Sequence, residues 1–356
     1  MIEAKKNLTN LTKEEFSQAI AKLGEKPFRA AQIWNWIYAR GAKSFEEMSN
    51  ISKETRQILA QNFSLDRPQI SQDITALDGT RKFLAKFSDC REVEVVFIPE
   101  ETRATLCISS QVGCTLACKF CYTGTQTLVR NLEVGEIVAQ VLLAKDLIND
   151  WQKLTRRITN IVFMGMGEPF FNYENVAAAV KILNDANGLD LSTRKITIST
   201  SGLVPEILRS AEELRTHLAI SLHATNDSLR SKIMAINKKY PLKSLLEACK
   251  IYNGKNLNQK ITFEYVMLKD INDQEVHARE LVNLIKKFNL NAKINLIPFN
   301  SWQGCEYECS SIEQIVRFQK ILKNAQLVAP IRKTRGNDVL AACGQLKSDS
   351  KREKTR

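Results

Sequence analysis

The sequence predicts an α/β protein built around a partial parallel barrel of six β/α units. From residue 104 onward, short apolar runs alternate with stretches of helical periodicity. The apolar runs cover residues 104–109, 158–164, 195–200, 217–222, 259–267 and 293–297. The helical stretches lie near residues 133–149, 173–186, 204–213, 243–252, 273–288 and 311–324. This alternation is typical of a parallel barrel or of part of one.

Glycine and polar residues follow the ends of these apolar runs. They stand at residues 165–168, 199–202 and 221–223 and at Asn300, and a loop with three cysteines follows the first run. In a parallel barrel the carboxyl ends of the strands meet at one mouth, where function collects. We therefore expect all of these residues to surround one site.

The first 70 residues predict a small helical domain. Residues 12–15 (Thr-Lys-Glu-Glu) form a capping box, and Pro27 opens a second helix. A second capping box at 44–47 and then Ser52 precede a third helix. Basic residues stand among aromatic ones along these helices, which suits contact with RNA. An ordinary helical bundle with a solvated face explains the pattern equally well.

Residues 71–103 predict a β-rich extension that links the helices to the barrel. Asp78 and Gly79 form a tight-turn signal between two strand-like segments, and a β-branched run covers residues 92–98. Glu94 lies inside that run. A buried carboxylate is costly unless it is paired, so Glu94 either faces solvent or belongs to the site. The residues alone favour the solvated face.

Composition indicates a globular protein of a reducing compartment. Of the 356 residues 44% are hydrophobic, and no apolar run approaches the roughly 20 residues that a membrane span needs. The nine cysteines are crowded in the middle, unlike a secreted disulfide framework. A cytoplasmic location without membrane contact is expected. The formal net charge of +12 is compatible with a polyanionic partner.

Cys114, Cys118 and Cys121 form a cluster of soft ligands aimed at one point. A structural zinc site takes four protein ligands, but residues 122–132 contain no Cys or His. Iron–sulfur clusters are also held by thiolates, and three cysteines on a four-iron cluster leave one iron open for chemistry. Two alternatives stay open: a structural zinc knuckle with a distant fourth ligand, and three unrelated buried thiols.

Motifs spread over nearly the whole chain carry a resemblance to a known family. They are PFRAAQ at 27–32, LCISSQVGC at 106–114, RNL at 130–132, GMGEP at 165–169, STSG at 199–202, SLH at 221–223 and TRGNDVLAACGQL at 334–346. With the cysteine spacing, they resemble the radical S-adenosylmethionine (SAM) superfamily and, within it, the RlmN branch of the RlmN/Cfr RNA methyltransferases. One departure is Thr127, where many members have a second glycine.

The resemblance implies a radical-SAM TIM-like partial barrel at 104–346 and an RNA-binding accessory domain at 1–70. It makes Cys114, Cys118 and Cys121 the ligands of a 4Fe–4S cluster. It places SAM against Gly167, Glu168, Ser199, Ser221, Leu222, His223 and Asn300. It makes Cys343 the methylated cysteine, Cys107 the cysteine that resolves the intermediate, and Glu94 the proton acceptor. This reverses the interpretation of Glu94 from the residues alone.

The activity implied by the resemblance is methylation of carbon 2 of adenine. The substrates are 23S rRNA, at the peptidyl-transferase centre, and tRNA, beside the anticodon. Two SAM molecules serve each turnover: one methylates Cys343, and the product leaves when Cys107 forms a disulfide with Cys343. The two cysteines are therefore expected to be close in space. An electron donor such as a flavodoxin system and a monomeric state are also expected.

Two other functions remain open from the sequence. Cfr-like methylation at carbon 8 of the same rRNA adenine needs the same cysteines, barrel and cofactor. A noncatalytic RNA-binding protein with a structural zinc is a rival from another class. Arg332, Lys333 and Arg335 are candidate RNA contacts because they adjoin Cys343. Cys305 and Cys309 are expected to be structural. Residues 347–356 predict a basic, disordered tail.

Overall fold

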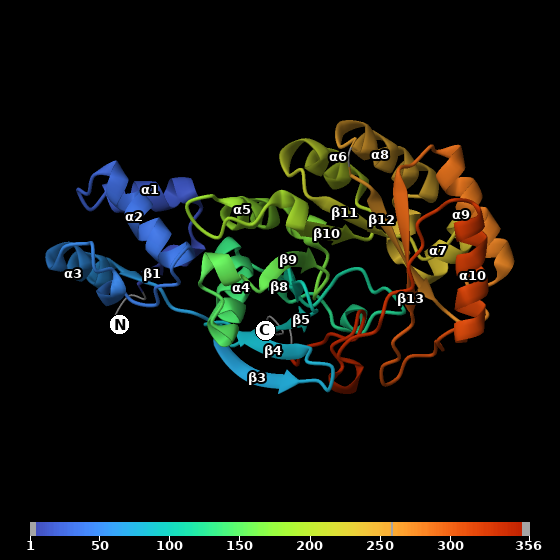
Figure 1. Cartoon of the computed structure of the whole chain (residues 1–356), viewed down its shortest axis with the longest axis horizontal. Helices are drawn as coiled ribbons and strands as arrows, with labels where there is room; N and C mark the ends of the chain where they lie inside the picture. Colours follow the sequence, from blue (N-terminus) through green and yellow to red (C-terminus); the bar gives the residue numbers. More distant parts are fainter. Residues whose placement is uncertain (1–4, 258, 351–356) are drawn as a thin grey trace, which may run out of the picture.

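The computed structural model describes residues 5–257 and 259–350, and the predicted partial barrel is confirmed. Six parallel strands lie side by side in chain order (Figure 1). They are β6 (Ala104–Cys107), β9 (Ile158–Phe163), β10 (Ile196–Thr200), β11 (His217–Ser221), β12 (Ile261–Met267) and β13 (Ala292–Pro298). The helices between and after them are α4 (Val134–Ile148), α5 (Tyr173–Asn184), α6 (Val204–Glu213), α8 (Leu242–Lys255), α9 (Glu275–Lys287) and α10 (Ile312–Asn324).

The core lies between these strands and the helices outside them. Ile161, Ile198 and Ile220, on successive strands, have no solvent-exposed surface, and Val141 and Leu245 on the covering helices are equally buried. Burial of this kind is the main favourable term in folding. One short helix, α7 (Asp227–Ile233), was not predicted from the sequence. Asn226 caps it by accepting a hydrogen bond from the Leu229 N–H.

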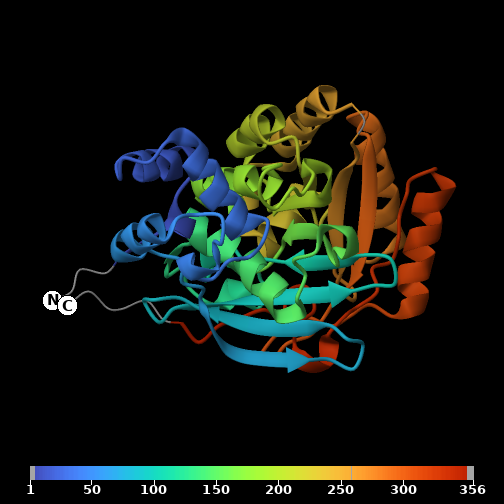
Figure 2. The same ribbon diagram turned by 60° about the vertical axis from the view of Figure 1, so that its left-hand side comes forward.

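Three antiparallel strands extend the sheet beyond β6. They are β5 (Glu92–Pro99), β4 (Arg81–Lys86) and β3 (Gln69–Thr75), and Figure 2 shows them side by side. The predicted turn at Asp78 and Gly79 joins β3 to β4, with Gly79 at φ +82°. Strand β3 begins at Gln69, well before the segment that the sequence indicated, because its long exposed face carries too few apolar residues to signal a strand.

The opposite edge of the sheet, at β13, is not closed by a seventh regular strand among the described residues. The chain after α10 runs parallel to β13 instead. The Ile294 N–H donates to the Val328 carbonyl at 2.8 Å, and the Arg332 N–H donates to the Leu296 carbonyl at 2.8 Å. These bonds lead residues 332–346 to the carboxyl ends of the strands.

Three helices at the amino-terminal end form the predicted helical unit, at one end of the molecule (Figure 1). They are α1 (Lys13–Ala21), α2 (Pro27–Tyr38) and α3 (Lys53–Asn62). The capping box at Thr12 and the Pro27 start are confirmed. The second capping box, at Ser44, opens only a short 3₁₀ turn, η2 (Phe45–Glu47).

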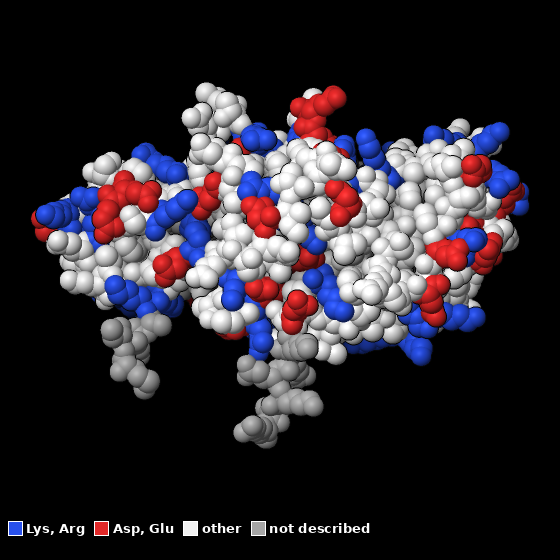
Figure 3. Space-filling view, turned by 90° about the horizontal axis from the view of Figure 1, so that it is seen from below, with Lys and Arg blue, Asp and Glu red and all other residues white. Residues whose placement is uncertain are grey.

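Charge is spread over the surface. Figure 3 shows basic and acidic side chains interspersed on the face seen from below, without one continuous basic area. The net charge therefore does not by itself locate a polyanion site on this face. Within the part of the chain that the structure describes, none of the helices combines the length and apolarity required to cross a bilayer.

The start of the predicted disordered tail is ordered. The Lys347 N–H donates to Glu94 Oε2 at 2.7 Å, and the Glu92 N–H donates to Ser350 Oγ at 2.9 Å. Residues 347–350 thus pack against β5. The Lys347 N–H supplies one of the donors that the buried Glu94 carboxylate needs. The remainder of the predicted tail, 351–356, lies outside the described residues.

Two glycines form a matched test of how the helical unit packs. A Cβ at Gly41 would lie 2.3 Å from the Trp151 ring, beyond α4, whereas a Cβ at Gly24 would meet open space; both residues have positive φ. Gly24→Ala should lower the free energy of unfolding by about 1–2 kcal/mol through backbone strain alone. Gly41→Ala should lower it by a further ~1–3 kcal/mol through overpacking. Equal losses in urea unfolding would contradict the packing of this unit on the core.

Candidate active site

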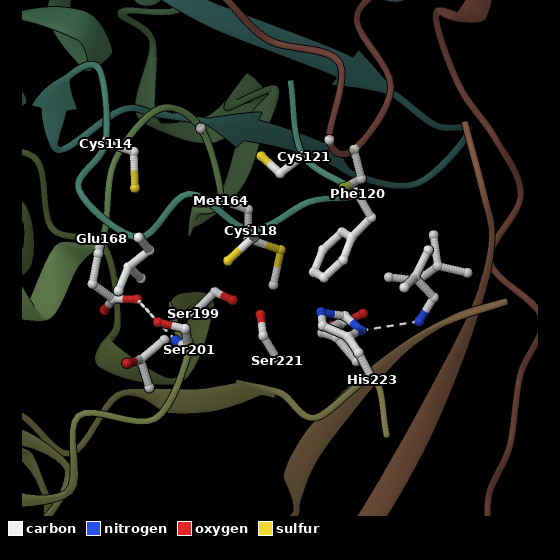
Figure 4. A pocket seen from close by; sticks show the side chains of 18 of the residues that line it. Cys114, Cys118, Phe120, Cys121, Met164, Glu168, Ser199, Ser201, Ser221 and His223 are labelled. Carbon is white, nitrogen blue, oxygen red and sulfur yellow. Dashed lines mark hydrogen bonds between the residues drawn. The ribbon is translucent and has the colours of Figure 1, made fainter. Parts of the chain in front are cut away.

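A cavity of about 160 Å³ opens at the carboxyl ends of the parallel strands. It contains most of the residues that the sequence indicated (Figure 4). Its walls include Cys114, Cys118, Cys121, Gly167, Glu168, Ser199, Ser221, His223, Asn300 and Cys343. In Figure 4 the three cysteines lie on one side and Glu168, the serines and His223 on the other. The predicted convergence on one mouth therefore holds for these residues.

The cysteine loop is folded tightly by backbone contacts. The Cys121 N–H donates to the Cys118 carbonyl at 3.0 Å, and the Cys114 N–H donates to the Gln126 carbonyl at 3.1 Å. Only glycine fits at 124, because a Cβ there would lie 2.7 Å from the Cys118 carbonyl oxygen. Burial raises the pKa of the Cys114 thiol to about 12, and burial next to Cys121 and Cys114 raises the pKa of Cys118.

The donor set fits an iron–sulfur cluster. Three soft thiol ligands border one cavity, and a thiolate is the form that binds metal. Among the described residues, no three Cys, His, Asp or Glu side chains converge closely enough to hold a single metal ion. The fit therefore rests on the chemistry of the three thiols, which are the ligands that hold iron–sulfur clusters.

The segment after β9 requires glycine. A Cβ at Gly165 would lie 2.7 Å from the Ile108 carbonyl oxygen, and one at Gly167 would lie 2.5 Å from Gln111 Cβ. Gly167 also has φ +95°. The segment thus passes directly against the strand that precedes the cysteine loop, which brings Glu168 to the cavity.

Glu168 joins two strand ends. Its Oε2 accepts hydrogen bonds from the Ser201 N–H at 2.8 Å and from Ser201 Oγ at 2.7 Å, and its Oε1 accepts from the Phe170 N–H. Burial raises the pKa of Glu168, while the bonds from Ser201 oppose that rise. The carboxylate fixes the wall and lies beside the cysteine loop.

Residues 221–223 form part of the cavity wall and are hydrogen-bonded to the neighbouring strand, β12. His223 has φ +56°, and its Nδ1 accepts a hydrogen bond from the Val266 N–H at 3.0 Å. Burial lowers the pKa of His223 to about 3, so the imidazole is neutral. The Leu222 side chain is fully buried behind the wall, and its N–H donates to the Glu264 carbonyl at 3.1 Å.

Arg230 is a buried support that sequence reasoning missed. Its Nη2 donates to the carbonyls of Ser201 and Ser221 at 2.7 and 2.8 Å, and its Nε donates to the Leu222 carbonyl at 3.0 Å. It therefore ties two strand ends together with no solvent-exposed surface. The signal for it was weak, because the short helix α7 has little apolar periodicity.

A second, larger cavity of about 970 Å³ meets the first one. Cys107 and Cys343 both line it, so the predicted proximity of these two cysteines is supported. The two cavities share Met164, Glu264, Ile297, Asn300, Arg332 and Cys343. Cys343 thus stands where the cavity with the three cysteines joins the larger one.

The loop that carries Cys343 is bonded to the cysteine loop and to β13. The Tyr122 N–H donates to the Gly344 carbonyl at 2.7 Å, and Thr123 Oγ1 donates to the Leu346 carbonyl at 2.5 Å. Asn300 Nδ2 donates to the Cys343 carbonyl at 3.1 Å. The bond from Asn300 to Cys343 and the bond from Tyr122 to the neighbouring Gly344 therefore fix the position of Cys343.

All nine cysteines, every one within the described residues, are free thiols, so the disulfide expected between Cys107 and Cys343 is not present in the structure. Cys107 is buried at the end of β6, where burial raises its pKa to about 12. The nearby Arg332 guanidinium opposes that rise. Arg332 also faces the shared region of the cavities, which its interpretation as an RNA contact did not anticipate.

Glu94 is buried on β5 but is absent from the described walls of both cavities. Its Oε1 lies 2.9 Å from Lys82 Nζ, and its Oε2 accepts a hydrogen bond from the Lys347 N–H. Burial raises the pKa of Glu94, and Lys82 opposes the rise. The interpretation from the residues alone, a solvated carboxylate, is wrong. Glu94 anchors the segment that follows the Cys343 loop.

Comparisons with known proteins agree with the fold. A model of the radical SAM superfamily matches residues 108–282. The crystal structure of a radical SAM methyltransferase from Sphaerobacter thermophilus superposes with a TM-score of 0.90 at 40% identity, over 96% of this chain and 99% of that one. The partial barrel and its three-cysteine mouth thus define a radical SAM protein.

Two further matches identify the family. A model of the ribosomal RNA large subunit methyltransferase N-terminal domain matches residues 6–65. The "Dual-specificity RNA methyltransferase RlmN" of Chelativorans sp. (strain BNC1) is 52% identical over 98% of this chain and 90% of its own length. That of Sinorhizobium medicae (strain WSM419) is 51% identical, over 98% and 89%. The chain belongs to the RlmN family.

Arg230 offers a test of the strand-end support. Arg230→Lys should lower the free energy of unfolding by about 3 kcal/mol or more, because a single ammonium leaves buried carbonyl oxygens unpaired at about 1–3 kcal/mol each. The control, Arg279→Lys, alters an exposed i,i+4 pair with Glu275 and should cost less than about 0.5 kcal/mol. Urea denaturation of both variants measures the difference, and equal costs would contradict the role of Arg230.

His223 predicts a specific pH dependence of stability. The folded-state pKa of about 3 lies below the ordinary value of 6.5, so the unfolded chain binds the extra proton between these values. Stability should fall by about 1.4 kcal/mol per pH unit below pH 6.5 from this group. His223→Asn, which tolerates positive φ, should remove that slope. Parallel pH profiles of the two proteins in urea unfolding would contradict the neutral, buried imidazole.

Proposed function

We propose that this chain is a radical SAM methyltransferase that methylates carbon 2 of adenine in 23S rRNA, at the peptidyl-transferase centre, and in tRNA, beside the anticodon. The observation that carries the proposal is the position of Cys343. It stands where the three-cysteine cavity meets the larger cavity that also holds Cys107. The names of the relatives, dual-specificity RNA methyltransferases, support the same activity.

The residues that would hold the cofactors are those at the strand ends. Cys114, Cys118 and Cys121 would bind a 4Fe–4S cluster through three thiolates. The SAM site would be formed by Gly167, Glu168, Ser199, Ser221, Leu222, His223 and Asn300. Together the two groups would supply a methyl donor and the radical chemistry that an unreactive aromatic carbon requires. A carbon that is not nucleophilic cannot take a methyl group by ordinary polar transfer.

Cys343 and Cys107 divide the thiol chemistry between them. Cys343 is the methyl acceptor, for which the thiolate is the reactive form, and Arg332 lies on the same shared wall. Cys107 is the residue that later attacks the Cys343 sulfur and frees the methylated base. Both thiols border the space in which the base would lie.

The surrounding parts have proposed roles as well. Residues 1–70 would form an accessory domain for RNA, residues 71–103 an extension, and residues 104–346 the catalytic core. Glu94 is the proposed proton acceptor, and its buried place behind the Cys343 loop requires a proton path from the base. The proposed setting is the cytoplasm, with a monomeric enzyme and an electron donor such as a flavodoxin system.

Methylation at carbon 8 is the nearest alternative, because it would use the same cavity and the same two cysteines. A zinc-stabilised RNA-binding protein is the alternative from another class. Three thiols on one cavity, with no fourth Cys or His in residues 122–132, favour a cluster over a structural zinc site. Metal and acid-labile sulfide analysis of anaerobically purified protein distinguishes the radical SAM enzyme from the zinc protein. Iron with sulfide is expected, and zinc without sulfide would refute the proposed enzymatic function.

Replacement of the two cysteines tests the proposed division of roles. Wild-type enzyme, supplied with SAM and a reductant, should yield 2-methyladenosine in the RNA, as identified by mass spectrometry. Cys343→Ala should yield none, because no methyl carrier remains. Cys107→Ala should accumulate protein linked covalently to RNA, because addition proceeds while release does not.

The matched control is Cys249→Ala, which changes a fully buried thiol on α8, away from the described cavity walls. It should retain the wild-type product. Full activity in Cys343→Ala would refute the carrier role, and 8-methyladenosine as the product would favour the alternative activity.

A further inference from the structure

Glu264 is a buried carboxylate that the proposed mechanism does not use. It lies in the middle of β12, only 4% of its surface is exposed, and it forms part of the walls of both cavities. Its carbonyl accepts a hydrogen bond from the Leu222 N–H, which fixes the backbone against the neighbouring strand end. The side chain is therefore held on the boundary between the two cavities.

One oxygen of this carboxylate is satisfied and the other is not. Asn295 Nδ2 donates to Oε1 at 3.0 Å. Oε2 is buried and has no hydrogen-bond partner among the described residues. Arg332 Nη1 lies 4.0 Å from it, too far for a hydrogen bond but near enough to offset its charge. A buried acceptor without a donor is costly, so a site that retains one is suited to a ligand that brings the donor.

The surroundings indicate which kind of molecule brings it. Glu264 shares the boundary with Cys343 and Met164, so a group presented to Cys343 comes close to the Glu264 side chain. The rest of the larger cavity is strongly basic, with Arg194, Lys195, Lys260, Lys293 and Lys333 on its walls. A polyanion is attracted to such a lining. Glu100 also lines this cavity, but it is paired with Arg103, whereas Glu264 Oε2 has no donor among the described residues.

We propose that Glu264 selects the target base: its Oε2 accepts a hydrogen bond from the exocyclic amine of adenine as the base is presented to Cys343. This rests on the proposed function and names the feature of the RNA that the site reads. Carboxylates accept hydrogen bonds from base amines, and a base removed from its stack is read along its Watson–Crick edge. A base with a carbonyl at the same position would place two acceptors against each other.

Asn295 sets the direction of this recognition. Because its amide donates to Oε1, the other carboxyl oxygen is the one left without a donor among the described residues. In Glu264→Gln the same donor would retain the carbonyl oxygen of the glutamine side chain and turn the new NH₂ group toward the base. The variant keeps the shape of the side chain but presents a donor where the wild type presents an acceptor.

Binding of modified RNA measures the proposed bond directly. The probes are anticodon stem-loop RNAs with adenosine, purine riboside, which lacks the amine, or inosine, which carries a carbonyl, at the target position. The reconstituted wild-type enzyme should bind the adenosine RNA about tenfold or more tightly than the purine riboside RNA. Glu264→Ala should weaken binding of the adenosine RNA alone and so remove the preference.

Glu264→Gln provides the second measurement. Its preference should shift toward the inosine RNA relative to the adenosine RNA by about tenfold, because the amide now donates to the carbonyl. The control is Glu206→Ala on α6, where a carboxylate oxygen is likewise buried without a hydrogen-bond partner among the described residues, but away from the described walls of both cavities. This control should keep the wild-type preference.

Two outcomes would overturn the assignment. One is equal weakening of all three RNAs in the Glu264 variants, which would indicate a structural role. The other is a loss of SAM affinity, measured by equilibrium binding, with the RNA preference unchanged. Nucleoside analysis of the wild-type product distinguishes failure of this assignment from failure of the proposed function. If the wild type is active but does not prefer the adenosine RNA, only the role of Glu264 is refuted. If the wild type is inactive, the proposed function is refuted.

Discussion

The open edge of β13 is the constraint on which the site depends. A closed barrel would leave no room for the chain that follows α10. Here that chain pairs with β13 through the Ile294 and Arg332 N–H groups and then turns over the carboxyl ends of the strands. The Tyr122–Gly344 hydrogen bond finally joins it to the cysteine loop. Two segments more than 200 residues apart in sequence thus form one wall.

The electrostatics of this mouth balance burial against pairing. Burial raises the pKa of Cys107, Glu168 and Glu264, which disfavours their charged forms. The opposing contributions come from Arg332 for Cys107 and Glu264, and from Ser201 for Glu168. The charged forms of these side chains are therefore stabilised only where a specific partner, such as Arg332 or Ser201, lies beside them. Perturbed pKa values of this kind are common in functional sites.

Sequence patterns predicted the strands and the mouth because both follow from short-range rules. Asn300 and Glu168 were expected at the site since each directly follows an apolar run, and parallel strands end on one side. The Cys107 and Cys343 pair was different. Only the family resemblance indicated that they meet, because no local pattern shows that the chain after α10 returns along β13.

Other residues escaped prediction for physical reasons. Glu264 lies in the middle of an apolar strand. The apolar residues around it predict the strand but do not show that its single carboxylate is buried at the site. Arg230 acts through backbone carbonyls of residues that are distant in sequence. Glu94 was misjudged from the residues alone because its partner, Lys82, lies two positions along the neighbouring strand from its direct pairing residue, Leu84. Strand register, which sequence does not give, decided its environment.

The central claim is that Cys343 carries the methyl group at the junction of the two cavities. The most direct measurement is peptide mass spectrometry of the reconstituted wild-type enzyme after incubation with methyl-labelled SAM in the absence of RNA. The label should appear on the peptide that contains Cys343. Label on another cysteine, or on none, would contradict the account.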